Sequence, residues 1–300
     1  MGCVFIRVLF PHFTEPGISA EKGIFASSAW PLTRLLVFIL IGVALLMVFF
    51  EERFIFIPRP YDGSDAWRPP GGDYVDVHFQ AADGTNLHGW YFQHPAPRAH
   101  VLHCHGNAGN ITGRLEIARQ LVRLGASVFL FDYRGYGRSE GSPTEWGVLE
   151  DARAARKEFS RRAGAGEAEI VLLGRSLGGG VAVDLAARDG ARGLILESTF
   201  TDLPEVASVH YPFLPAKWLL RTRLDSLSKI RHYLGHVLQF HGTDDRIVPL
   251  EMGKRLFAAV PGREGVQKEF FLWDGGDHNQ HPPPEYYEAM GRFFDRLPSD

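Results

Sequence analysis

The segment Gly174-Arg175-Ser176-Leu177-Gly178 constrains the fold more than any other part of the chain. It directly follows the apolar run at residues 170–173 and precedes a run of small residues at 179–183. A β-branched and aliphatic run, a Gly-x-Ser-x-Gly turn and a helix-compatible stretch are typical of a strand, a sharp turn and a helix. On such a turn the serine hydroxyl is exposed, and the unpaired N–H groups of the new helix face it. The pattern predicts a nucleophilic serine, with an accidental glycine-rich turn as the alternative.

Apolar runs and helix-like stretches alternate through most of the remaining chain. Residues 74–80 and 86–92, joined by the turn at 82–84, predict a β-hairpin. Further strands are expected at 101–103, 128–131, 170–173, 194–196, 237–240 and 269–272, and helices at 111–124, 145–159, 176–190, 251–260 and 285–297. Repeated strand–helix units predict an α/β fold with a doubly wound, mostly parallel sheet. The functional loops of such a sheet lie at the carboxyl ends of its strands.

Residues 200–234 interrupt this alternation between two strands. The segment is rich in proline and aromatic residues, and it is too long for a simple connection. Because it begins directly after the carboxyl end of a strand, we interpret it as a short helical lid over the site. The alternative is helical padding on the surface of the domain.

A long apolar stretch lies in the N-terminal part of the chain. Residues 35–50 carry no charge, and the apolar run resumes after Glu51-Glu52-Arg53. The stretch lacks both the cleavage site of a signal peptide and the polar face of a core helix, which predicts a single membrane anchor at residues 35–57. The chain then divides into an N-terminal segment (1–34), the anchor, a linker (58–72) and a catalytic domain (73–300). The placement of Lys and Arg favours a catalytic domain outside the cytoplasm.

The composition argues against several classes of partner. The net charge of −3 provides no basic field for nucleic acid. The chain has two cysteines, too few for a disulfide framework, and no zinc-like spacing. In the cluster His103-Cys104-His105, residues i and i+2 share one face of a strand without a third ligand nearby in the sequence. A metal site is therefore not expected there, and no cofactor is predicted.

A nucleophilic serine needs an adjacent base, and that base needs an orienting acid. In this architecture both follow the serine along the chain. The segment after the strand at 237–240 contains Asp244 and Asp245, and the segment after the last strand contains Asp277 and His278. His278 is the candidate base and Asp277 a turn former beside it, whereas spacing alone leaves Asp244 and Asp245 equivalent as the acid.

These motifs resemble those of the α/β-hydrolase superfamily over residues 74–297. They are most similar to membrane-anchored hydrolases of the serine aminopeptidase and monoglyceride-lipase-like group. The matching segments in chain order are 105–110, 132–137, 174–178, 241–248 and 276–278. The resemblance implies Ser176 as nucleophile, His278 as base and Asp245 as the acid. It also implies an oxyanion hole formed by the backbone N–H groups of Asn107 and Leu177.

The expected function is therefore that of a membrane-anchored serine hydrolase acting on a lipid-like acyl ester through an acyl-enzyme. A serine peptidase and an acyl-protein thioesterase are alternatives on the same fold, and a catalytically silent scaffold is the alternative from another class. A chain that starts near Tyr61 is expected to be soluble and active, because the residues before it are assigned to the anchor and linker.

Overall fold

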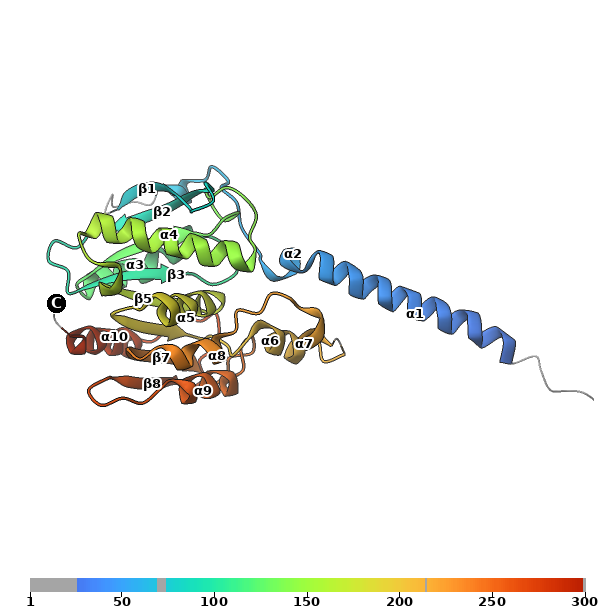
Figure 1. Ribbon diagram of the computed structural model, residues 1–300. Coiled ribbons are helices and arrows are strands. Elements are labelled where there is room, and N and C mark those ends of the chain that lie inside the picture. The colour runs from blue at the N-terminus through green and yellow to red at the C-terminus, as the bar shows by residue number, and fades with distance from the viewer. Residues whose placement is uncertain (1–25, 69–73, 214, 299–300) are drawn as a thin grey trace, which may run out of the picture. The chain divides into compact units, whose positions relative to one another are not determined.

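The computed structural model describes residues 26–68, 74–213 and 215–298 (Figure 1). The chain divides into two units, Met1–Leu46 and Met47–Asp300, which we describe separately. Of the first unit, residues 26–46 are described, and they belong to helix α1 (Ala26–Phe49). Most of the segment expected at residues 1–34 thus lies outside the described residues.

The membrane-spanning helix expected at residues 35–57 is not found. Within the described parts of the chain, no helix is both long enough and apolar enough to cross a membrane. The expected segment is divided between α1, which ends at Phe49, and a separate helix α2 (Glu51–Ile55). The physical reason for this division is Glu51. Its carboxylate is buried in the second unit and accepts hydrogen bonds there, so the apolar residues that follow it belong to the folded domain.

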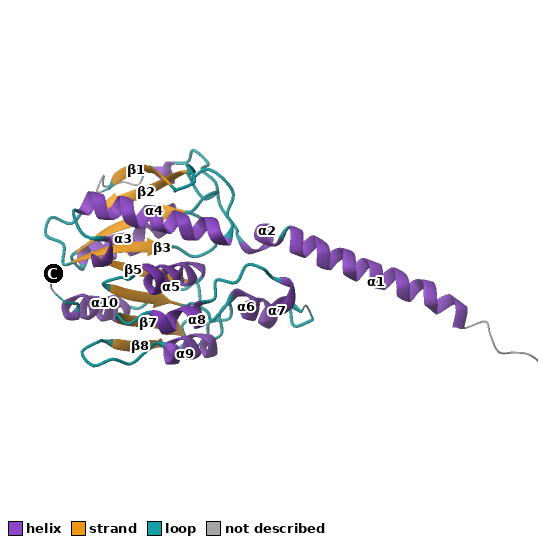
Figure 2. Cartoon of the chain, viewed as in Figure 1, coloured by secondary structure: helices purple, strands orange, loops and turns teal. Residues whose placement is uncertain are grey.

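One eight-stranded sheet forms the centre of the second unit, in the order β1-β2-β4-β3-β5-β6-β7-β8 (Figure 2). The strands are Val75–Gln80 (β1), Asn86–Phe92 (β2), Ala99–Cys104 (β3), Ala126–Asp132 (β4), Ile170–Arg175 (β5), Gly193–Glu197 (β6), His236–Gly242 (β7) and Lys268–Trp273 (β8). β2 is antiparallel to both of its neighbours, and all other pairs are parallel. The predicted mostly parallel α/β sheet is confirmed.

Helices cover both faces of the sheet (Figure 1). Successive residues of a strand point to opposite faces, so β5 places Leu172 in one buried cluster and Leu173 in another. Side chains of α4 (Glu145–Ala163), α5 (Leu177–Asp189) and α9 (Leu250–Ala259) complete the first cluster, and those of α3 (Leu115–Arg123) and α10 (Pro284–Arg296) complete the second. This double cover leaves the carboxyl ends of the strands to the loops.

The segment predicted as a lid contains three short helices. They are α6 (Leu203–His210), α7 (Ala216–Leu219) and α8 (Ser226–Lys229), followed by a 3₁₀ turn at Ile230–His232. α8 and the 3₁₀ turn contact α5 and belong to the body of the domain. α6 and α7 contact each other and line a cavity described below. We call residues 203–220, which contain α6 and α7, the cap.

Residues 51–61 run along the domain before β1, and we call this segment the strap. Pro58 pairs with Gly109, and Pro60 pairs with Gly137, each as an isolated parallel bridge. The N–H of Tyr61 donates to the carbonyl of Gly137 at 2.7 Å. The beginning of the segment expected as a linker at 58–72 is thus bound to two loops, while residues 69–72 lie outside the described residues.

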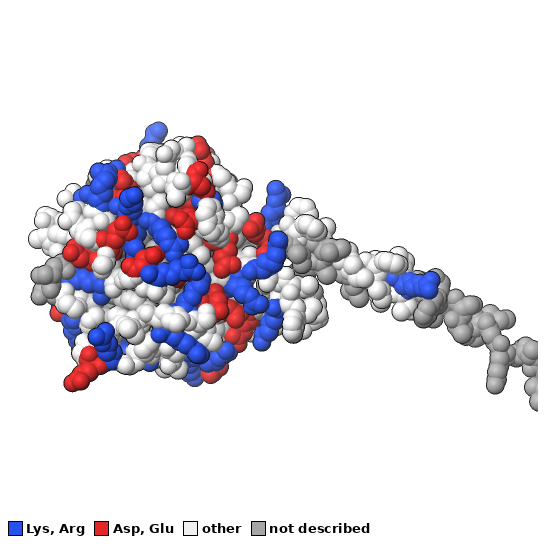
Figure 3. All heavy atoms as spheres, in the orientation of Figure 1, with Lys and Arg blue, Asp and Glu red and all other residues white. Residues whose placement is uncertain are grey.

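Charged side chains of both signs are interspersed over the visible face of the domain (Figure 3). Lys and Arg number 32 in the whole chain and Asp and Glu number 35, so the near balance of the sequence recurs locally on this face. The mainly apolar wall of the cavity described below contrasts with this mixed surface.

Candidate active site

Ser176 lies on the turn between β5 and α5, as the motif predicts. Its φ of 51° and ψ of −119° are unfavourable for a residue with a side chain. Two hydrogen bonds hold this conformation: the Ser176 N–H donates to the carbonyl of Glu197 (2.9 Å), and the hydroxyl of Thr199 donates to the Ser176 carbonyl (2.8 Å). Gly178 permits the close approach of α5 to β3, because a Cβ there would lie 2.0 Å from the carbonyl oxygen of Cys104.

His278 lies on the loop after β8, and its imidazole contacts Ser176. The Nε2 atom is 3.1 Å from the Ser176 Oγ. The loop is fixed from both sides: the Arg175 guanidinium donates to the His278 carbonyl (2.6 Å), and the His278 N–H donates to the Asp277 carboxylate (2.8 Å). The imidazole is therefore held within hydrogen-bond distance of the serine hydroxyl.

Asp245 lies on the loop after β7 and contacts the other side of the same imidazole. Its Oδ2 is 2.7 Å from Nδ1 of His278, and its Oδ1 accepts from the N–H groups of Ile247 (2.9 Å) and Val248 (2.8 Å). A carboxylate can only accept hydrogen bonds, so Nδ1 carries the proton. Nε2 is then free to accept the proton of the Ser176 hydroxyl.

The two other candidate aspartates occupy different places. Asp244 is exposed, and its Oδ1 lies 3.5 Å from the hydroxyl of Thr243. Asp277 accepts from the N–H groups of His278 and Arg246, and these hydrogen bonds lower the pKa of its carboxyl group. The geometry therefore distinguishes Asp245 from Asp244, which spacing alone does not, and places Asp277 in the turn that carries the histidine.

A further ion pair, between Arg175 and Glu197, was not predicted. Glu197, at the end of β6, lies 3.2 Å from the Arg175 Nε through its Oε1 and accepts from the Tyr286 hydroxyl (2.6 Å) through its Oε2. Burial raises the pKa of Tyr286 well above its usual value, so the hydroxyl remains a donor. This network orients the Arg175 guanidinium that binds the His278 carbonyl. The sequence signal that could have identified Glu197 is a charged residue at the end of a buried strand.

The two backbone donors implied by the resemblance come from the start of α5 and from the loop after β3. Leu177 is the first residue of α5, so its N–H has no acceptor within the helix. Asn107 follows Gly106 on the loop after β3, and we call residues 106–110 the oxyanion loop. A Cβ on Gly106 would lie 3.5 Å from the Ser176 Cβ, which shows how closely this loop approaches the serine turn.

A cavity of about 690 Å³ opens onto Ser176. Its wall comes from the strap, the oxyanion loop, the cap and the loops that carry Ser176 and His278, and most of the wall is apolar. The apolar lining residues include Phe54, Ile55 and Ile57 of the strap and Leu203, Val206, Ala207, Leu219 and Leu220 of the cap. Such a cavity favours an apolar group of the substrate next to the serine.

Arg114 also lines the cavity. One of its nitrogens, Nη2, donates to the carbonyl of Ala108 at 2.8 Å, while its Nε is buried without a hydrogen-bond partner among the described residues. Burial and the neighbouring Arg175 guanidinium lower the pKa of Arg114. Positive charge is thus concentrated close to the oxyanion loop.

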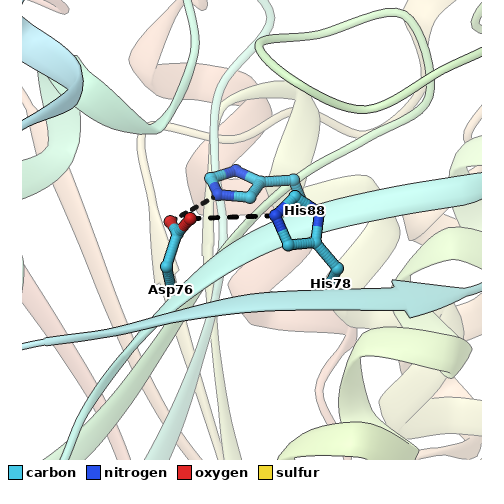
Figure 4. Close-up of side chains that lie close together, drawn as sticks. All are labelled: Asp76, His78 and His88. Atoms are coloured by element: carbon cyan, nitrogen blue, oxygen red, sulfur yellow. Dashed lines mark hydrogen bonds and ion pairs between the residues drawn. The ribbon is translucent and has the colours of Figure 1, made fainter.

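A cluster of potential metal ligands lies elsewhere, on β1 and β2 (Figure 4). His78 and His88 are cross-strand neighbours, and Asp76 lies two residues before His78. The Asp76 carboxylate already accepts from Nε2 of His88 (2.7 Å) and from the indole N–H of Trp90 (2.9 Å). The guanidinium of Arg138 also lies 3.1 Å from its Oδ2 and brings a positive charge to the same carboxylate. The cluster therefore fits an internal hydrogen-bond network better than a metal site.

The histidines of the His103-Cys104-His105 segment do not suggest a metal site either. All three residues are buried. Burial raises the pKa of the Cys104 thiol to about 12 and lowers that of the His105 imidazole to about 3. At neutral pH the thiol thus keeps its proton and the His105 imidazole stays uncharged. Nδ1 of His105 donates to the carbonyl of Gly106 at 2.7 Å, which holds the start of the oxyanion loop.

Comparison with known proteins places this geometry in a family. A family model described as serine aminopeptidase, S33, matches residues 95–234. The chain is 34% identical over 261 residues to the alpha/beta hydrolase domain-containing protein WAV2 of Arabidopsis thaliana, an alignment that covers 79% of this chain and 83% of that protein. This chain belongs to the α/β-hydrolase superfamily.

Other similar proteins extend the comparison. The chain is 38% identical over 194 residues to the lysophosphatidylserine lipase ABHD12 of Danio rerio, which covers 56% of this chain and 49% of that protein. A solved structure of an esterase from Pyrococcus furiosus aligns with a TM-score of 0.66 and 18% identity, over 81% of this chain and 97% of that chain. At this low identity, the structural likeness shows a shared fold.

Proposed function

We propose that this protein is a serine hydrolase that cleaves carboxylic esters of apolar acyl groups. Ser176 is the nucleophile, His278 the general base and Asp245 the acid that orients the base. One observation carries the proposal: an unbroken chain of contacts runs from Ser176 Oγ through the His278 imidazole to the Asp245 carboxylate, beside an apolar cavity.

The first half of the reaction forms an acyl-enzyme. The Ser176 Oγ attacks the ester carbonyl carbon while its proton passes to Nε2 of His278. The Asp245 carboxylate stabilises the imidazolium ion that results, because it already accepts the Nδ1 proton. The imidazolium then gives the Nε2 proton to the leaving alkoxide, and an alcohol departs.

The second half returns the enzyme to its starting state. Water gives a proton to Nε2 of His278 and attacks the acyl carbon, and the proton then passes to Ser176 Oγ as the carboxylic acid is released. In both halves the tetrahedral intermediate carries a negative oxygen. The N–H groups of Asn107 and Leu177 are the proposed donors to that oxygen, since both lie beside the serine turn.

The cavity supports an apolar acyl substrate. Its volume of about 690 Å³ and its aliphatic wall are suited to an acyl chain next to the scissile bond. The names of an esterase and of a lysophosphatidylserine lipase among the similar proteins agree with this class of reaction.

A peptidase acting on free N-termini is the alternative that the family description suggests. Such an enzyme needs an anionic group for the substrate ammonium ion. Glu51 is the one carboxylate among the described residues that line the cavity, and it already accepts from the backbone N–H groups of Arg221 and Thr222. This commitment favours the esterase.

Kinetics on matched substrates test the proposal. We expect p-nitrophenyl esters to be hydrolysed, with kcat/KM rising from acetyl to octanoyl because the cavity binds the longer chain. The aminoacyl p-nitroanilides that report aminopeptidase activity should react far more slowly. Faster cleavage of the anilides would favour the peptidase, and purified, folded protein that cleaves neither class would favour the silent scaffold.

A further inference from the structure

The side chain of Asn107 is held at three points. Its Oδ1 accepts from the N–H of Ile57 (3.1 Å) and from the hydroxyl of Tyr136 (3.0 Å). Its Nδ2 donates to the carbonyl of Ile55. An amide bonded through both its oxygen and its nitrogen has little freedom to rotate. The strap thus fixes the residue whose backbone N–H is a proposed oxyanion donor.

The strap also holds the remainder of the oxyanion loop. The N–H of Arg59 donates to the carbonyl of Gly109 at 3.1 Å, and the side chain of Asn110 donates to the carbonyl of Arg59 at 2.9 Å. Gly109 has a φ of +89°, a conformation that favours glycine, so this turn of the loop depends on its sequence. The strap and the loop therefore form one hydrogen-bonded unit.

At its other end, the strap contacts the chain that leaves the cap. Oε2 of Glu51 accepts from the N–H of Arg221 (2.9 Å), and its Oε1 accepts from the N–H (3.2 Å) and the hydroxyl (3.0 Å) of Thr222. Glu51 and Thr222 are each 3% exposed. A buried carboxylate is stable only when donors surround it, so this contact resists opening.

We propose that the strap sets the geometry of the oxyanion hole through Asn107 and couples it to the cap through Glu51. This makes both side chains positioning residues of the hydrolysis, and the inference rests on the proposed function. In this proposal the Asn107 N–H donates to an oxygen that becomes negative only in the transition state. A shift of this group therefore lowers kcat and leaves the binding of a short ester unchanged.

The variant Asn107→Ala tests the contact between the strap and Asn107, because it keeps the backbone N–H and removes all three hydrogen bonds of the side chain. We expect kcat for p-nitrophenyl acetate to fall about 10- to 100-fold, part of the loss that follows removal of an oxyanion donor. KM should stay within about twofold of the wild-type value. The inhibition constant of a trifluoromethyl ketone, which forms a tetrahedral adduct, should rise by the same factor by which kcat/KM falls.

A second variant keeps the test decisive if Asn107→Ala folds poorly. Tyr136→Phe removes one of the two donors to the Asn107 Oδ1, together with the interaction of the hydroxyl with the backbone N–H of Ile57, while the buried ring remains. We expect a fall in kcat of about two- to fivefold with an unchanged KM. If both variants are folded and keep the wild-type kcat, or if both lose activity only through KM, the inference is overturned.

The variant Glu51→Gln tests the link to the cap. It replaces one acceptor oxygen with an amide donor that faces N–H groups of residues 221 and 222. We expect a fall in kcat of about three- to tenfold, whereas the neighbouring control Glu52→Gln should change kcat by less than about twofold. In the Asn107→Ala background, Glu51→Gln should have a smaller effect than in the wild type, because both act through one strap.

The outcomes separate the two proposals. Wild-type protein without hydrolase activity contradicts the proposed function itself. Active wild-type protein in which the effects of Glu51→Gln and Asn107→Ala simply multiply contradicts the coupling through the strap. Non-multiplicative losses in kcat, with a matching loss of trifluoromethyl ketone affinity, support it.

Discussion

The two sides of the cavity are built in different ways. The side with Ser176, Asp245 and His278 lies on turns that directly follow β5, β7 and β8, three strands of one parallel sheet. The other side consists of the strap and the cap. Backbone bridges hold the strap against two loops, and side-chain carboxylates bind the chain that leaves the cap. Glu51 holds residues 221 and 222, and Glu145 of α4 accepts from the N–H groups of residues 223 and 224.

This difference separates two tasks. A strand cannot shift without breaking the pairing with its neighbours, so side chains at strand ends keep the fixed distances that proton transfer needs. The described residues of the cap form short helices outside the sheet, so the cap can change its shape at lower cost, which suits the selection of substrates. We therefore expect large losses of kcat from changes on the sheet side, and changes in chain-length preference from changes in the cap.

The largest effect is expected for Ser176→Ala. Without the hydroxyl, ester hydrolysis should fall by several orders of magnitude, as in other serine hydrolases. The thermal midpoint should stay the same or rise, because an active-site serine on a strained turn is held at some cost in stability. Ester kinetics and a thermal scan check both parts. A variant that keeps a substantial fraction of wild-type activity would show that Ser176 is not the nucleophile.

The acid is tested by two adjacent isosteric changes. Asp245→Asn should lower kcat by about 10⁴-fold, because the amide no longer favours the Nδ1-protonated imidazole. Asp244→Asn is the matched control, and it should change kcat by less than about threefold, since Asp244 is exposed and does not contact the ring. Steady-state kinetics on one short ester decide between them. The reverse order would show that the acid comes from the neighbouring position.

The cap side is tested by filling the cavity. Ala207 of α6 lines it, whereas Val209 on the same helix does not and is 49% exposed. Ala207→Phe should lower kcat/KM for an octanoyl ester about tenfold or more and leave the acetyl ester within about threefold. Val209→Phe should change neither. Equal losses on both esters for Ala207→Phe would mean that the cap supports the chemistry and does not select the chain length.

The smallest effect concerns the pH dependence of stability on the sheet side. Burial raises the pKa of Asp132, at the end of β4, from 3.8 to about 8. The folded protein thus keeps a proton that the unfolded chain loses, so this group lowers the free energy of unfolding as the pH rises between these two values. Asp132→Asn keeps an acceptor for the N–H of Ile111 and does not titrate.

Denaturant unfolding at pH 5 and pH 8 checks this prediction. Relative to the wild type, Asp132→Asn should gain stability at the higher pH. Asp244→Asn serves as the exposed control and should show no such gain. An Asp132→Asn variant whose stability relative to the wild type is equal at both pH values would mean that the buried carboxyl group is already ionised in the folded protein.

Sequence reasoning succeeded where local patterns carry the information. The sheet, the serine turn and the positions of Asp245 and His278 after strands all follow from apolar runs and adjacent motifs. Spacing alone could not distinguish Asp244 from Asp245 as the acid. The deciding difference is which carboxylate faces His278 in the folded loop. That orientation depends on the N–H groups of Ile247 and Val248.

The contacts of the strap could not be predicted, because its partners are distant in the sequence. Phe54, Ile55 and Ile57 continue the apolar run of residues 35–50, and this suggested one membrane segment. In the structure these three residues line the cavity. Glu51 accepts hydrogen bonds from Arg221 and Thr222, which lie 170 and 171 positions further along the chain. No local sequence pattern reveals so distant a contact. A chain that starts near Tyr61 lacks most of the strap, so we now expect it to be less active than the full chain.

Identification of the covalently modified residue tests most directly whether Ser176 is the nucleophile. Wild-type protein is incubated with a fluorophosphonate, and the adduct is located by peptide mass spectrometry. We expect one adduct per chain, on Ser176, because the turn exposes this hydroxyl and His278 accepts its proton. Ser176→Ala should show no adduct, and His278→Ala should react far more slowly. A folded wild-type protein that remains unlabelled, or that is labelled at another residue, would contradict the account.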